Sequence, residues 1–235
     1  MAKHLRADET YQRVLRSAAG LIAERGFLGT SVNDLLERVG LTKNAFYSYF
    51  SSKEALAVAI VKETAAQWPP LITAFKSLRA PALDTVIALS FEVAALCATD
   101  DLTRAGVRLS VERDTIKSPI PPPFHGWAEE IESLLSPAGD WELMGLAAPA
   151  DVAARVIVTC LIGAQYFSTG DEAPVDLPRR LAEIWTVMLP GLRPTPDPSA
   201  RIAAGQALRD RARAAAAAMT SMTTLLPVVP RRSVD

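Results

Sequence analysis

The chain has 235 residues, of which nearly half are apolar, and a formal net charge of −1. These proportions exclude an intrinsically disordered chain and a uniformly basic one, and they provide a core for one domain with a small companion or for two modest domains. The charge is uneven, because residues 1–53 carry eight Lys and Arg against five Asp and Glu, which puts this segment at +3 and the remainder at −4. The asymmetry predicts an N-terminal module that faces an anionic partner.

The N-terminal quarter predicts four helices in succession. The first ends at Gly26 and has one apolar stripe, formed by Val14, Ala18, Leu21 and Ile22. A short second helix follows the cap Thr30-Ser31 and ends at Gly40, a third covers residues 43–50 after the cap Thr42, and a fourth runs from Ser52 toward Trp68. Two short helices joined by a tight turn at Gly40, after a longer helix, predict a helix-turn-helix within a three-helix bundle.

The third of these helices is predicted to have two unlike faces. At 100° per residue one face carries Ala45, Phe46, Tyr49 and Phe50, and the other carries Lys43, Asn44, Tyr47 and Ser48. We expect the aromatic face to close the bundle against the first two helices. The polar face has donors that suit phosphates and base edges, so it is the predicted DNA-reading surface.

The rest of the chain also has helical periodicity and no strand pattern. Further helices are predicted at about 71–79, 83–98, 101–114, 124–136, 150–168 and 177–190. From residue 194 the composition changes to prolines and then an alanine-rich run, which favours helix but offers little to bury. We expect a loosely held helix with a disordered end there. The predicted fold class is all-α.

The cysteines, histidines and N-terminus point away from several classes of protein. Cys97 and Cys160 stand apart in apolar surroundings, as buried thiols in a reducing compartment do. Lys3 begins a charged N-terminus that is unlike a signal peptide, and the most apolar run, 156–167, is too short to span a bilayer. With only His4 and His125 and no metal-ligand spacing, an enzyme or a metal site is not expected. The chain is predicted to be cytoplasmic, without a cofactor and without contact with a membrane.

Five motifs occur in order between residues 26 and 54: GF (26–27), TSV (30–32), VGLTK (39–43), FYSYF (46–50) and SKE (52–54). In these motifs the chain resembles the TetR family of transcriptional repressors. The resemblance implies that Thr30, Lys43, Tyr47 and Lys53 contact the phosphates of a double-stranded, palindromic operator, and that the cap at Ser31 faces the DNA backbone as well. Ser48 joins this predicted set through its place on the polar face of the third helix.

Two positions depart from the family pattern. Asn44 stands where the family usually has glycine, and its amide can pair with adenine through two hydrogen bonds, so we expect it to read a base; a solvated position is the alternative. Tyr49 stands where the family usually has histidine, which calls the phosphate contact of that position into question. Tyr49 is nevertheless kept in the predicted DNA-binding set.

The body carries a second set of motifs: LC (96–97), RAGVRL (104–109), PIPPP (119–123), FHGW (124–127) and RRLAEIW (179–185). They resemble the γ-butyrolactone receptor branch of the family, from antibiotic-producing actinomycetes, up to about residue 193. The resemblance implies that Trp127 lines a hormone pocket, where an indole offers a flat apolar wall and one N–H donor. It also implies a ligand that is a γ-butyrolactone, a butenolide or a furan, and control of antibiotic or other secondary-metabolite genes.

Further ligand contacts are expected from helical phase alone. Gln67, Phe91, Leu109 and Thr159 are predicted to point inward, with Gln67 and Thr159 as the polar groups of a mostly apolar pocket. The helices near 150–168 and 177–190 are each apolar over more than one core face, so we expect them to form the four-helix interface of a homodimer. The residues of these stripes are Val152, Val156, Cys160, Gly163 and Phe167 in the first and Leu181, Ile184, Trp185, Met188 and Leu189 in the second.

The expected division is therefore a DNA-binding domain at 1–53, a ligand-binding and dimerisation domain at 54–193, and a tail at 194–235. Three rival interpretations remain open on the sequence alone. They are an enzyme, a DNA binder that senses no hormone or senses an unrelated apolar molecule or partner, and a helical adaptor.

Overall fold

The computed structural model describes residues 2–120, 125–136, 145–168, 176–193 and 196–225, and these residues are helical without any strand. The predicted all-α fold is confirmed. The α helices are α1 (Ala2–Arg25), α2 (Val32–Val39), α3 (Lys43–Tyr49), α4 (Lys53–Ala66), α5 (Trp68–Ser77), α6 (Ala82–Thr99), α7 (Asp101–Val111), α8 (His125–Leu135), α9 (Ala150–Ser168), α10 (Leu177–Leu192) and α11 (Pro198–Leu225), with a 3₁₀ turn η1 (Arg113–Thr115).

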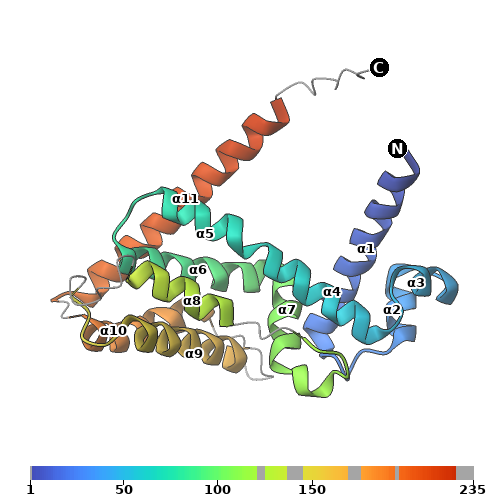
Figure 1. The fold of residues 1–235 in the computed structure, drawn as a ribbon, viewed down its shortest axis with the longest axis horizontal. Helices are drawn as coiled ribbons and strands as arrows, with labels where there is room; N and C mark the ends of the chain where they lie inside the picture. The colour runs from blue at the N-terminus through green and yellow to red at the C-terminus, as the bar shows by residue number, and fades with distance from the viewer. Residues whose placement is uncertain (1, 121–124, 137–144, 169–175, 194–195, 226–235) are drawn as a thin grey trace.

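Helices α1, α2 and α3 form a bundle at one end of the molecule, and α8, α9 and α10 lie at the other end (Figure 1). We call the bundle the head and the part from α5 to α11 the body. Gly26 ends α1 and Gly40 ends α2, each at a positive φ (75° and 71°) that a residue with a side chain rarely adopts. The head is not closed by its own helices alone, because Leu102, Ala105 and Leu109 of α7 belong to the same buried cluster.

Helix α4 leaves the head at Lys53 and reaches the body, where it stops at Ala66. The expected helix end near Trp68 falls at Gln67 instead, and α5 begins directly at Trp68. Pro69 and Pro70 occupy the first turn of α5, where a missing N–H costs nothing, so they start this helix. The chain therefore changes direction between two helices without a loop.

Helix α6 is the centre of the body. It packs on α7, α8, α10 and α11, and eleven of its residues are buried. Its length and apolar composition would allow it to cross a membrane, but most of it is enclosed by the other helices, as in the core of a globular domain.

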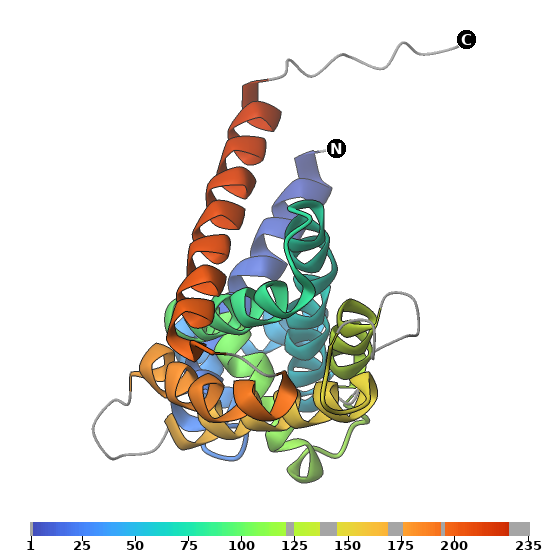
Figure 2. The same cartoon turned by 90° about the vertical axis from the view of Figure 1, so that its left-hand side faces the viewer.

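The C-terminal helix α11 differs from its prediction. A loosely held helix was expected, yet Ile202, Leu208 and Ala212 are buried against the body, because α11 lies along α6 and touches α5. Its C-terminal half projects from the body on the same side as the N-terminal half of α1 (Figures 1 and 2). Residues 226–235, expected to be disordered, lie outside the described residues.

Candidate functional site

The reading helix α3 has the two faces that the sequence predicts. The Thr42 side chain caps it by accepting from the Ala45 N–H (3.3 Å), and Phe46 and Phe50 are buried in the head. On the opposite face Lys43, Asn44, Tyr47 and Ser48 are exposed, Tyr47 to 43%. This face is polar, carries one cation and lies on a rigid support, which suits contacts with phosphates and base edges.

Tyr49 and Ser31 lie at the margins of this face. Tyr49 is half-buried and packs against the head core, so only part of its ring is on the surface. The Ser31 hydroxyl is exposed but engaged, since it donates to Asp34 Oδ2 (2.5 Å) and accepts from the Asp34 N–H (3.1 Å). The hydrogen bonds from Ser31 lower the pKa of Asp34, so this capping box is formed at neutral pH.

Two predicted phosphate contacts are placed differently by the structure. Thr30 is 0% exposed, and its hydroxyl donates to the Gly26 carbonyl (2.9 Å), so this side chain cannot reach DNA. Lys53 is half-buried over the Phe27 ring and donates to the Phe27 and Thr30 carbonyls (2.7 and 2.8 Å). Burial lowers the pKa of Lys53. Both residues fix the turn between α1 and α2, and neither lies on the open face of α3.

Helix α7 holds the same turn from the body side. Arg108 donates to the carbonyls of Ala23 and Glu24 at the end of α1 (3.0 and 3.1 Å) and is paired with Glu112 (2.8 Å). Glu112 in turn accepts from the Phe27 N–H (2.7 Å). We call Arg108 and Glu112 the clasp. The head is thus connected to the body by α7 as well as by α4.

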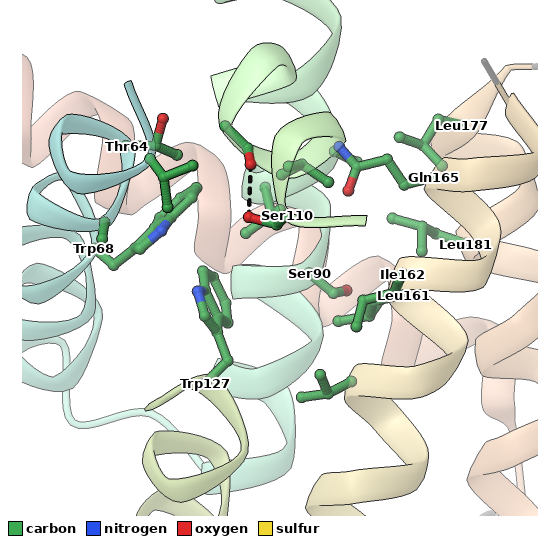
Figure 3. A pocket seen from close by; sticks show the side chains of 17 residues that line it. Thr64, Trp68, Ser90, Ser110, Trp127, Leu161, Ile162, Gln165, Leu177 and Leu181 are labelled. Atoms are coloured by element: carbon green, nitrogen blue, oxygen red, sulfur yellow. Dashed lines mark hydrogen bonds between the residues drawn. The ribbon is translucent and has the colours of Figure 1, made fainter. Parts of the chain in front are cut away.

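A cavity lies in the body between α4, α5, α6, α7, α8, α9 and α10. It contains about 60 Å³ of space for water-sized atoms. Trp68 and Trp127 form one side of the cavity, and their rings meet edge to face with ring centroids 4.8 Å apart and ring planes at 73°. The opposite side is formed by Leu161, Ile162, Leu177 and Leu181 (Figure 3). An engineered cavity that admits benzene has roughly 150 Å³. A ligand with an alkyl chain therefore has to push these walls apart.

The polar groups of the cavity are few and mostly committed. The hydroxyls of Thr64, Ser90 and Ser110 donate to the carbonyls of Leu102, Ile87 and Gly106 (2.9, 2.6 and 2.7 Å). Within the described part of the chain, neither Trp indole N–H donates to a protein atom, while the Gln165 amide donates to Cys97 Sγ. None of the described lining residues is charged. The available donors suit the carbonyl oxygen of a neutral ligand.

Of the five predicted ligand contacts, the structure brings only Trp127 to this cavity. Phe91 and Leu109 are 0% exposed in two separate core clusters, and Gln67 caps the end of α4, with its side chain near the Thr103 hydroxyl (3.5 Å). Thr159 faces outward and bonds the Arg155 carbonyl (2.8 Å). Helical phase correctly predicted that Phe91 and Leu109 point inward, but it did not distinguish core from cavity, because the cavity follows from how seven helices meet.

Trp68 and Gln165 are lining residues that the sequence analysis did not select. Gln165 had a usable signal, because it is a lone amide in the apolar run of α9, four residues after Leu161. Trp68 adjoins the break between α4 and α5, where an aromatic side chain is free to point away from both helix stripes. Neither signal distinguishes a cavity wall from ordinary core without the tertiary structure.

Helices α9 and α10 have an apolar surface that no other part of the described chain covers. Val152, Val156 and Val187 are exposed, Val187 to 80%, and a Cβ added at Gly163 would meet nothing within 4 Å. Of the stripe predicted for α10, Trp185 is turned inward with Leu181 and Leu189, and its indole donates to Ser90 Oγ (2.9 Å). The side chain of Phe167 lies outside the described residues.

Comparisons with known proteins agree with this division into head and body. Residues 14–60 match the bacterial regulatory proteins of the tetR family, and residues 80–194 match the tetracyclin repressor-like C-terminal domain. One similar solved structure is described as the molecular basis for control of antibiotic production by bacterial hormones. Its sequence is 33% identical and its TM-score is 0.70, and the match covers 79% of this chain and 98% of that chain. The chain belongs to the tetR family.

Within the tetR family, two of the similar proteins are named as receptors. The A-factor receptor protein of Streptomyces griseus is 29% identical over 195 residues, which are 82% of this chain and 67% of that protein. CprB from Streptomyces coelicolor A3(2) has a TM-score of 0.72 at 27% identity, over 87% of this chain and 98% of that one. A γ-butyrolactone receptor structure has a TM-score of 0.70 at 26% identity, and the match covers 87% of this chain and 99% of that chain. These relatives agree with the branch that the body motifs suggested.

Proposed function

We propose that this protein is a cytoplasmic repressor that binds a palindromic operator as a homodimer and leaves it when a neutral γ-butyrolactone or butenolide enters the cavity. The observation that supports this best is the placement of the cavity. It touches α4 and α7, and those two helices hold the turn between α1 and α2 through Lys53 and the clasp. The likeness to the A-factor receptor and to γ-butyrolactone receptor structures supports the ligand class, and with it the control of secondary-metabolite genes.

The chemistry of the cavity narrows the three ligand classes that the sequence left open. A furan that carries a carboxylate brings a charge into a site whose described walls contain no cation, and burying such a charge unpaired is costly. A lactone or butenolide presents a neutral carbonyl that Trp68, Trp127 or Gln165 can donate to. Burial raises the pKa of Cys97 to about 12, which leaves almost no thiolate, so we do not expect this thiol to attack a butenolide.

Release from DNA follows from wall movement. A ligand larger than the cavity displaces Thr64 and Ala65 on α4, or Val107 and Ser110 on α7, and either displacement pulls on the turn between α1 and α2. In a dimer the two copies of α3 must lie one DNA turn apart, roughly 34–36 Å, to enter successive major grooves. A hundredfold loss of operator affinity requires a coupling free energy of about 2.7 kcal/mol.

The decisive experiment is a mobility shift with operator DNA across butyrolactones, butenolides and a furan carboxylate. We expect the neutral compounds to release the wild-type protein and the carboxylate to leave it bound. Trp127→Ala should bind the operator normally without inducer and show no release with it, whereas Thr159→Ala, outside the cavity, should respond as wild type. Release of Trp127→Ala with the wild-type dose response would refute the cavity as the sensor. Release of the wild type by none of the compounds would favour a regulator that senses something else.

The dimer is tested separately on the exposed face of α9 and α10. Val187→Asp places a charge on this apolar surface, so we expect sedimentation to show monomers and the affinity for a full palindrome to fall while a half-site is still bound weakly. A dimer that survives this change would place the interface elsewhere.

A further inference from the structure

Helix α11 lies behind the cavity, after the segment that matches the family's C-terminal domain, which ends at residue 194. It packs on the face of α6 that turns away from the cavity, while Ser90, Val93 and Ala94 on the other face of α6 line the cavity. Contacts that hold α11 in place against α6 therefore also hold in place the side of the cavity that α6 forms. Figure 1 shows α11 running beside both α5 and α6.

Three contacts attach α11 to α6 in the same order along both helices. Arg201 pairs with Asp84 (2.8 Å) and Arg213 pairs with Glu92 (2.6 Å), and Glu92 is only 5% exposed. Between these ion pairs Gly205 allows close approach, since a Cβ there would lie 2.4 Å from Ile87 Cγ2. A buried carboxylate with an Arg partner and a glycine at the crossing point fix both the orientation and the spacing of the two helices.

The same helix supports Trp68. Leu208 and Ala212 of α11 form one buried cluster with Trp68, Ile72 and Phe75 of α5. Trp68 is 9% exposed, and its ring meets the Trp127 ring edge to face, with the ring centroids 4.8 Å apart. Leu208 thus lies in the packing that holds one aromatic wall of the cavity in place.

We propose that α11 sets the width of the cavity, with Leu208 as a positioning residue that limits how long an alkyl chain the ligand can carry. This inference rests on the cavity being the ligand site, as in the proposed function. Shortening Leu208 lets Trp68 retreat toward α11 and makes room for additional methylene groups. Each methylene that gains a buried place strengthens binding about fourfold, so a change of roughly tenfold in chain-length preference is expected for Leu208→Ala.

The experiment compares Leu208→Ala with Ile202→Ala in the full-length protein. Both variants shorten a buried aliphatic side chain of α11, but Ile202 packs in the cluster of Trp185 and not in that of Trp68. The neutral fluorophore N-phenyl-1-naphthylamine is bound and then displaced with γ-octalactone and with γ-dodecalactone. We expect Leu208→Ala to favour the longer lactone roughly tenfold more than wild type does. Ile202→Ala should keep the wild-type ratio.

Equal ratios in all three proteins, or the same shift in both variants, would overturn the inference. Near-ultraviolet circular dichroism provides a measurement without ligand. The difference between each protein and its Trp127→Phe counterpart reports the Trp68–Trp127 pair apart from Trp185, and this difference is expected to change in Leu208→Ala and to stay unchanged in Ile202→Ala. If none of the proteins binds the fluorophore, the cavity is not the ligand site and the proposed function is refuted. If the dichroism signal nevertheless changes as expected, the support of Trp68 by α11 stands. An unchanged signal refutes that support. Leu208→Val replaces Leu208→Ala if the latter does not fold.

Discussion

In the head the exposed polar face of α3 includes Lys43 and Asn44, whose side chains make no hydrogen bond among the described residues, whereas in the body the hydroxyls at the cavity donate hydrogen bonds to backbone carbonyls. The exposed Lys43 and Asn44 side chains are accessible to a partner that offers negative charge or the hydrogen-bonding edge of a base. Ser90 and Ser110 are already bonded to carbonyls of their own helices. The head therefore suits a large, charged partner and the body a small, neutral one.

The same contrast separates framework from contact within the head. Lys53 and Lys43 are both basic and belong to neighbouring motifs, yet one is bonded to two carbonyls and the other is exposed. A lysine next to the exposed face of α3 is therefore not by itself a candidate phosphate contact. The predictions below test this separation and then the connection between head and body, from the largest expected effect to the smallest.

Lys53→Met should unfold the head more easily, because it removes the charged donor from the Phe27 and Thr30 carbonyls in a partly buried turn and leaves the Phe27 carbonyl with only the Thr30 N–H (3.3 Å). Loss of two hydrogen bonds from a charged group should lower the free energy of unfolding by about 3 kcal/mol. Urea denaturation followed by the helical circular dichroism signal measures this free energy. The matched control Lys43→Met should leave unfolding unchanged and reduce the salt slope of operator binding by about one. If Lys53→Met altered only the salt slope, Lys53 would be a phosphate contact after all.

Asn44→Gly should relax the preference at one base pair in each half-site. The change removes an amide that can donate to and accept from adenine, at a cost of roughly 1–3 kcal/mol in discrimination against the wrong base. Selection from a randomised operator library measures this preference, with Ser48→Ala on the same face for comparison. An unaltered base preference would make Asn44 a solvated residue of the exposed face.

Glu112→Gln should loosen the clasp without removing the acceptor for the Phe27 N–H. Losing the charge that faces Arg108 weakens a half-exposed pair by about 1 kcal/mol at most. Hydrogen exchange at the Phe27 amide should accelerate, and release by inducer should need a higher dose. Glu132→Gln on the exposed surface of α8 is the control. Wild-type exchange and dose response in Glu112→Gln would leave α4 as the only connection that matters.

Cys97 should resist iodoacetamide in the native protein at pH 8 and react readily after unfolding. Its folded pKa of about 12 exceeds the unfolded value, so the buried thiol contributes stability that is complete below about pH 8.5 and is lost as the pH rises toward 12. Mass spectrometry of labelled peptides across this range gives the measurement. Rapid labelling of native Cys97 at pH 8 would show that the cavity side of α6 is open to reagents.

The sequence determined the helices, their caps and the two faces of α3. Each of these depends on residues fewer than ten positions apart, such as the capping box of Ser31 with Asp34, or on the helical period alone. For the same reason the buried and exposed sides of α3 agree with prediction, and the motifs of the head were sufficient to indicate the family.

Only the tertiary structure decided what Lys53, Trp68 and α11 do. The carbonyls that bind Lys53 lie 26 and 23 positions before it, so its commitment cannot be seen in its own helix. The cavity depends on the placement of seven helices, and helical phase reports an inward direction without saying whether core or cavity lies there. An alanine-rich run promises little burial, yet Gly205 and Leu208 dock α11 because α5 and α6 present a complementary surface. The roles of Lys53, Trp68 and α11 differ from the expectations because they depend on packing between residues far apart in the sequence, which the local sequence pattern does not encode.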